Sequence, residues 1–182
     1  MTTTRIEDDL RRFARVLVQA GFGSAQDQVA ELSDAVHAEL PHTDSLILAR
    51  AWLAAAHQQW CADAAAWGLV TDHDRLLAAI SECAAHDLPV LAGVDDIDEV
   101  RHHVAASPRA VRGVAWFSRQ SVWDAVMEGV LRIDLRHPDG TVVGAGAPLA
   151  EAFTSCLRRH DIPARYVSGR VEAATHWRRR PG

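Results

Sequence analysis

Hydrophobic residues in the first half of the chain recur every three or four positions, which is the period of amphipathic helices. Residues that typically begin or end helices divide this half into segments. They predict four helices: one ending near Gly21 and Gly23, one from Ser24 to Pro41, one from Asp44 or Ser45 to Gly68, and one opened by Thr71 and Asp74. We therefore expect the chain to be helical up to about residue 87.

The third and longest predicted helix carries large apolar residues at every seventh position. Leu46, Leu53, Trp60 and Trp67 would share its buried side. Trp52 lies about 100 degrees from this stripe, the angle of one residue step, which can leave its ring at the surface. The alternative is that all six tryptophans lie in the core or line a groove, because large aromatic side chains are mostly buried.

After residue 87 the hydrophobic period changes to two and then alternates with short helical stretches. Leu131, Ile133 and Leu135 alternate with charged residues, as in a strand with one solvated face. Strands are predicted at 88–91, 111–118, 131–136, 141–143, 164–167 and 171–175, with helices at 95–106, 121–128 and 148–160. The strand at 141–143 follows a tight turn and should return antiparallel.

Helices followed by strand-rich sequence predict an α+β fold. We expect a helical N-terminal half packed on a mixed, mostly antiparallel sheet of about five to six strands, with strands and helices alternating in the C-terminal half. The predicted regions are 1–87, which is helical, and 88–182, which contains the sheet. They are expected to form one compact domain.

Composition narrows the class of protein. All 19 basic residues are arginine and the net charge is −5, which argues against general binding to nucleic acid. The run Arg178–Arg180 is interpreted as a solvated basic tail. No apolar run reaches the roughly 18 to 20 residues needed to cross a bilayer, so no membrane association is expected. Arginine without lysine, together with abundant alanine, indicates a bacterial protein, which we expect in the cytoplasm.

Cysteines and histidines do not predict a complete metal site. Cys61, Cys83 and Cys156 are far apart in apolar helical settings and are interpreted as small core residues. His57 and Cys61 are four residues apart and could hold half of a zinc site, but no second pair with ligand spacing follows. We expect no bound metal and no cofactor.

Several segments carry a resemblance to a known family. They are Trp67, Val70–Leu76, Gly113–Gln120, the strand near Leu131–Ile133, and Trp177–Arg179. Over roughly residues 60–180 the chain resembles an uncharacterised bacterial domain-of-unknown-function family of similar length. The resemblance supports the fold and implies no activity.

The chain departs from that family's pattern at the positions that could carry chemistry. In the family, a cysteine-containing segment lies between the first two strands, and the aromatic strand ends in a His-x-Gln-Asp motif. Here no cysteine stands between Cys83 and Cys156, Ser118 occupies the histidine position, and Ser121 occupies the aspartate position. The resemblance therefore implies no catalytic or binding role for Ser118 or Ser121.

No catalytic motif is recognisable, so the leading hypothesis is a non-enzymatic protein-interaction or regulatory module. Arginines near tryptophans favour it, because these residues are enriched at protein interfaces. The alternative is a small-molecule-binding or hydrolytic enzyme with a site in the groove between the N-terminal helices and the sheet. The candidate interaction or groove residues are Trp52, Asp72, His73, Arg119, Gln120 and Trp123. The oligomeric state is left open.

Overall fold

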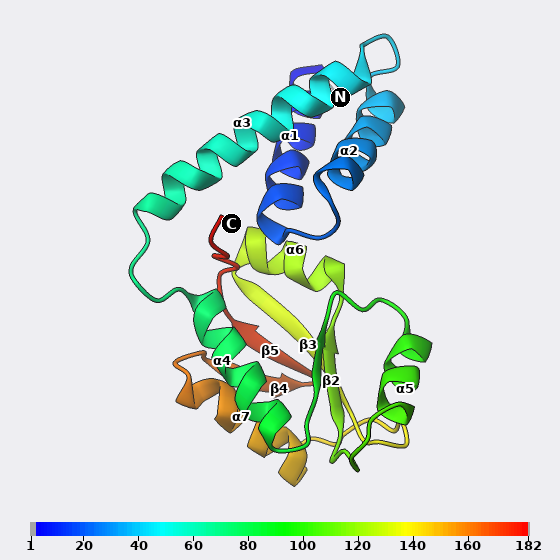
Figure 1. Cartoon of the computed structure of the whole chain (residues 1–182), viewed down its shortest axis with the longest axis vertical. Coiled ribbons are helices and arrows are strands. Elements are labelled where there is room, and N and C mark those ends of the chain that lie inside the picture. The colour runs from blue at the N-terminus through cyan, green and yellow to red at the C-terminus, as the bar shows by residue number, and fades with distance from the viewer. Residues whose placement is uncertain (1–2, 182) are drawn as a thin grey trace. The chain divides into compact units, whose positions relative to one another are not determined.

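The computed structural model describes residues 3–181 and confirms the α+β class (Figure 1). Over these residues there are seven helices and one five-stranded mixed sheet, and every strand follows residue 87. Two compact units are present. The helical unit contains the residues up to Leu69 and the C-terminal segment from Arg179, and the sheet unit is Val70–Arg178. None of the helices in the described part of the chain could cross a membrane.

The helical unit contains α1 (Thr3–Ala20), α2 (Ala25–Glu39) and α3 (Ser45–Ala65). The predicted cap of α2 is confirmed. Ser24 Oγ accepts the Asp27 N–H at 3.2 Å, and the Asp27 carboxylate accepts the Ser24 N–H at 2.7 Å. The exposed N–H groups at the helix start are thereby satisfied.

The buried side of α3 differs from the predicted stripe. Leu46 is 42% exposed, whereas the buried residues are Ala49, Leu53, Ala56, Trp60 and Ala64. Leu46 still lies on the buried side of the helix, but it stands in the first turn of α3, where a side chain has fewer neighbours than at mid-helix. Trp67 also departs from the predicted stripe, because α3 ends at Ala65 and Trp67 is half-buried beyond it. Much of the buried side is therefore alanine, which lets helices approach closely.

The C-terminal arginines also differ from the prediction of a solvated tail. The Arg179 guanidinium lies 5.2 Å from the centroid of the Trp60 ring, and its carbonyl accepts the Trp60 indole N–H at 2.9 Å. Burial lowers the pKa of Arg179. The stacking surface of Trp60 explains why Arg179 packs against the helical unit. Arg178 and Arg180 are exposed, but the Arg180 guanidinium donates to the carbonyls of Gly68 and Leu69.

The sheet unit has the strand order β1-β2-β3-β5-β4. Its strands are β1 (Val90–Ala92), β2 (Val114–Phe117), β3 (Val130–Arg136), β4 (Ala164–Val167) and β5 (Arg170–Ala174). Only β1 and β2 are parallel; the other neighbours are antiparallel. The predicted alternation of β3 is confirmed, because Leu131, Ile133 and Leu135 are fully buried.

Four helices belong to this unit: α4 (Asp72–Ala85), α5 (Ile97–Ala105), α6 (Arg119–Glu128) and α7 (Pro148–Arg159). Figure 1 shows α4 and α7 side by side, and the thiols of Cys83 and Cys156 join them. On the other face of the sheet, α5 packs against Val114 and Trp116. Ser118 caps α6, so this helix begins two residues before the predicted start at Ser121.

The predicted return strand at 141–143 does not form. Val142 makes a single antiparallel bridge to Arg136 and is otherwise exposed. The reason is that β2 and β5 already occupy both sides of β3, and β5 pairs with it from Val130 to Asp134. Only the last two residues of β3, Leu135 and Arg136, are left for the segment that follows the turn, and Arg136 makes the single bridge.

Candidate functional site

A surface groove of about 480 Å³ lies between α1 and α3 of the helical unit. We call it the arginine groove. Its lining residues are Asp8, Arg11, Arg12, Arg15, Trp52, Ala55, Ala56 and Gln59. Trp52, predicted as an interaction residue, is half-buried at this groove. The small alanines of α3 leave the space, and the arginines of α1 supply its charge.

The arginine groove is positively charged on an otherwise acidic segment. Residues 1–69 contain five arginines and nine acidic residues, and three of the five arginines line the groove. Arg11 pairs with Glu7 at 3.0 Å and with Asp8 at 3.4 Å. Arg12 and Arg15 are exposed and make no ion pair with any residue that the structure describes. Their charges are available to an external anion.

Trp52 is held in the groove by a cation–π contact. The Arg11 guanidinium carbon lies 5.3 Å from the centroid of the Trp52 ring. Such contacts contribute roughly 0.5–1 kcal/mol at exposed sites, which is enough to favour one ring orientation. The groove therefore presents an oriented aromatic surface beside two unneutralised cations.

The other predicted site residues belong to the sheet unit. At the start of α4, the Asp72 carboxylate accepts a hydrogen bond from the Arg75 guanidinium at 3.0 Å. It accepts another from the His176 backbone N–H at 3.2 Å. The His73 ring meets Trp177 edge-on at 4.8 Å. Asp72 thus connects the start of α4 to the last residues of the sheet unit, and the neighbouring His73 ring packs against Trp177.

Arg119, Gln120 and Trp123 lie together on α6. The Arg119 guanidinium carbon is 5.9 Å from the Trp123 ring centroid, and the Arg119 backbone N–H donates to Asp95 at 3.2 Å. Gln120 is exposed and donates to Asp124 at 3.0 Å. The structure thus forms a second arginine–tryptophan pair on a different unit from Trp52.

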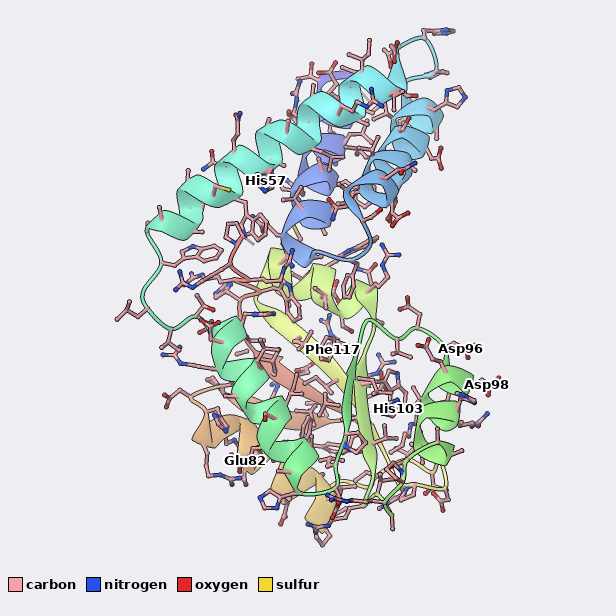
Figure 2. All side chains as sticks on the ribbon, viewed as in Figure 1. His57, Glu82, Asp96, Asp98, His103 and Phe117 are labelled. Atoms are coloured by element: carbon pink, nitrogen blue, oxygen red, sulfur yellow. The ribbon has the colours of Figure 1, made fainter. Side chains whose placement is uncertain are left out.

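A second cluster lies between α4 and α7 of the sheet unit. The Cys83 and Cys156 sulfurs are 3.4 Å apart, and His160 Nε2 lies 2.7 Å from a Glu82 oxygen. Arg159 also bonds to the Glu82 carboxylate. Figure 2 labels Glu82 on α4. The donor atoms of Glu82, Cys156 and His160 all lie within 4.8 Å of one another, so these residues could hold a metal ion.

The charges of this cluster are set by its surroundings. Hydrogen bonds from Arg159 and then His160 lower the pKa of Glu82 to about 2, so its carboxylate is ionised. Burial raises the pKa of both thiols, Cys83 and Cys156. Because the thiolate is the nucleophile, these cysteines are poor nucleophiles without a bound cation.

Sequence reasoning located Cys83 and Cys156 in the core, which the structure confirms, but it did not join them. It also placed Cys61 in the core, whereas Cys61 is exposed. The prediction that no second pair with ligand spacing follows was wrong, because Cys156 and His160 have the same four-residue spacing as His57 and Cys61. This spacing was the available signal. The partners from α4 could not be found, because 73 residues separate Cys83 from Cys156.

Acidic residues at the start of α5 stabilise the N-terminus of this helix. Asp96 caps α5 by accepting the Asp98 N–H at 2.9 Å, and Asp98 pairs with Arg101 at 2.7 Å. Figure 2 shows both aspartates at this end of α5.

The predicted membership of an uncharacterised family is confirmed. A family model described as Domain of unknown function (DUF6891) matches residues 3–181. The chain belongs to this family. The DUF6891 match extends beyond the segments that carried the resemblance and includes α1, α2 and α3. No curated protein and no solved structure matches the chain.

Proposed function

We propose that this DUF6891 chain is a non-enzymatic protein-interaction module of the bacterial cytoplasm, and that its arginine groove binds an acidic segment of a partner protein. The observation that carries this proposal is the pair of exposed arginines, Arg12 and Arg15, beside the oriented Trp52 ring. The bacterial and cytoplasmic parts of the proposal rest on composition alone.

The chemistry of the groove matches an acidic partner that also carries an apolar residue. Arginine binds carboxylates through paired N–H donors. An exposed ion pair contributes only about 0.2–1 kcal/mol, so Arg12 and Arg15 alone give weak binding. Trp52 and the adjoining alanines add apolar contact area, and tryptophan and arginine dominate binding energies at protein interfaces. We expect weak, salt-sensitive binding.

The test uses the full chain and a synthetic helical peptide of defined sequence. The peptide carries glutamates four residues apart on one face and a leucine between them, and the control peptide has glutamine in place of each glutamate. Binding is measured by fluorescence anisotropy at low and high ionic strength. We expect the acidic peptide to bind and added salt to weaken the complex.

Charge reversal at the groove supplies the decisive variant. Arg12→Glu combined with Arg15→Glu should weaken peptide binding by about ten-fold or more, because attraction becomes repulsion. The matched control is Arg5→Glu with Arg50→Glu, two exposed positions on the same helices outside the groove, which should change affinity less than about two-fold. Equal binding of the two peptides, or equal effects of the two double variants, would contradict the proposal.

Arg119 and Trp123 are proposed as a second contact surface, supported by their stacked arrangement on α6. Trp123→Ala and Arg119→Ala should each weaken capture of the natural partner once circular dichroism shows that they fold. If both variants capture that partner at the wild-type level, α6 is not part of the interface.

Small-molecule binding is a second candidate function. One observation favours it: a cavity of about 250 Å³ between α4 and α7. Its lining is mostly apolar, with Glu82, His86, Arg112 and Arg159 as the charged or polar residues. Asp72, His73, Arg119 and Gln120, the residues first considered for a ligand or hydrolytic site, do not line this cavity. A ligand that raises the melting temperature of the wild-type chain but not of an Ala152→Trp variant, which fills the cavity, would support this role.

A further inference from the structure

Four side chains with metal-binding atoms come together where α4 meets the end of α7. Glu82 and Cys83 are consecutive on α4, whereas Cys156 and His160 are one helical turn apart. The Cys83 and Cys156 sulfurs are 3.4 Å apart, and His160 Nε2 lies 2.7 Å from a Glu82 oxygen. The donor atoms of Glu82, Cys156 and His160 lie within 4.8 Å of one another, and Cys83 is joined to them by its contact with Cys156. The set contains two sulfurs, one nitrogen and one oxygen.

The cluster contains more than two cysteines packed against each other in the core. The Glu82 and His160 side chains are 29% and 25% exposed, so the cluster reaches from the buried thiols to the surface. The cavity of about 250 Å³ is lined by Glu82, Cys83 and Cys156 and gives an ion a path to them. A binding site requires donors, a path and a suitable charge, and the first two are present.

The charge of the cluster suits a divalent cation. Arg159 neutralises the Glu82 carboxylate. When a dication binds, the two S–H bonds break, two metal–sulfur bonds form, and two protons leave to the solvent without any change of oxidation state. The His160–Glu82 hydrogen bond breaks as well, so that His160 Nε2, with the imidazole proton on Nδ1, and the Glu82 carboxylate can each bond to the metal. The two positive charges of the ion then neutralise the two thiolates, and the Glu82–Arg159 pair stays balanced.

We propose that Glu82, Cys83, Cys156 and His160 bind one thiophilic divalent cation of the zinc class. Thiolate and imidazole donors select zinc over magnesium or calcium, which prefer oxygen donors. In a tetrahedral site with Zn–S bonds of about 2.3 Å, the two sulfurs lie about 3.8 Å apart. The sulfurs of this chain are 3.4 Å apart, so this pair needs only a small outward movement. The Cys83 side chain must in addition turn toward Glu82 and His160, because the group of donors within 4.8 Å contains Cys156 and not Cys83. This site is independent of the arginine groove.

The test is titration of the reduced, chelator-stripped, untagged full chain with Zn²⁺ and separately with Co²⁺. Calorimetry should give one Zn²⁺ per chain, with proton release that is detected by comparing buffers of different ionisation enthalpy. Co²⁺ should produce the sulfur-to-cobalt charge-transfer absorption of thiolate ligation. Removal of thiolate or imidazole donors by Cys156→Ser or His160→Gln should weaken Zn²⁺ binding by about ten-fold to a hundred-fold or more.

The control is a matched pair at the same spacing on α3. Cys61 Sγ lies 3.6 Å from His57 Nδ1, both residues are exposed, and Figure 2 labels His57. Cys61→Ser with His57→Gln should leave the stoichiometry and the cobalt spectrum unchanged. His160→Gln removes a partly exposed donor, so it keeps the test decisive even if Cys156→Ser does not fold.

Three outcomes would overturn the proposal. The first is no cobalt charge-transfer band in the reduced chain. The second is one bound Zn²⁺ that is lost with Cys61→Ser and His57→Gln but kept with His160→Gln. The third is that the purified chain contains a Cys83–Cys156 disulfide and that, after this disulfide is reduced to two thiols, the chain still binds no metal.

Discussion

The helical unit and the sheet unit build their cores from different side chains. Of the twelve largest side chains that are fully buried, ten belong to the sheet unit, and only Leu32 and Val36 belong to the helical unit. In the helical unit, alanines such as Ala14 and Ala49 are completely buried. One unit therefore depends on filling space with large residues, and the other depends on close approach of helices through small ones.

This difference implies opposite sensitivities to changes of volume. Truncating a large core residue leaves a cavity, whereas enlarging a buried alanine forces packed helices apart. The comparison can be tested by urea unfolding, because tryptophan fluorescence reports on both units: Trp52, Trp60 and Trp67 lie in one, and Trp116, Trp123 and Trp177 lie in the other.

The largest effect is expected for Phe153→Ala in α7. Phe153 is 1% exposed, and its loss should lower the free energy of unfolding by about 3–5 kcal/mol. Urea titration followed by circular dichroism measures the change. Leu149→Ala, at a half-buried position on the same helix, is the control and should cost less. A Phe153→Ala chain as stable as the wild type would show that this core does not depend on large side chains.

A smaller effect of the other kind is expected for Ala49→Leu in α3. Ala49 is 0% exposed, so the added side chain should lower the free energy of unfolding by about 1–3 kcal/mol. Ala54→Leu, at an exposed position of the same helix, should be nearly neutral. Stabilisation by Ala49→Leu in the urea titration would mean that the helical unit has unfilled space.

Removing a helix cap should have a similar, modest effect in either unit. Thr71 caps α4 and Ser24 caps α2, each in a reciprocal pair of hydrogen bonds with an aspartate. Thr71→Ala and Ser24→Ala should each cost about 1 kcal/mol of stability. Thermal unfolding compares them with Ser81→Ala, an exposed position inside α4. A cap variant with a melting temperature equal to that of Ser81→Ala would contradict this role.

The smallest effect is a pH dependence at the cap of α2. The pKa of Asp27 is lowered because its carboxylate accepts hydrogen bonds from the Ser24 backbone and side chain. Its contribution to stability is therefore present above the unfolded pKa of about 3.9 and is lost as pH falls through the lower folded pKa. The melting temperatures of wild type and Asp27→Asn should differ near neutral pH and converge in acid. A difference that stays constant with pH would exclude this linkage.

Local patterns in the sequence were enough to predict most elements. Ser24, Asp44 and Thr71 cap helices as predicted, because a cap depends on residues three positions apart. The failed strand at 141–143 depended on β5, which occupies the side of β3 that a simple hairpin would have used. The pairing of β3 with β5 joins residues some forty positions apart, so no local pattern in the sequence could have indicated it.

The same limit applies to the candidate sites. Trp52 was identified from its position outside the apolar stripe, and the structure adds Arg11 from another helix. The donors on α7 could be recognised by spacing, but Glu82 and Cys83 are brought to them by the packing of two helices. Sequence patterns thus proposed Trp52 for the first site and no donor for the second, and only the tertiary structure assembled the two sets.

The return of the C-terminal segment to the helical unit has a consequence for synthesis of the chain. Trp60 donates its indole N–H to the carbonyl of Arg179, and the whole sheet unit lies between these two residues in sequence. A ribosome therefore releases α1, α2 and α3 long before it makes the residue that covers Trp60. Because domains fold progressively from the N-terminus during translation, the first unit to emerge is the last to be completed.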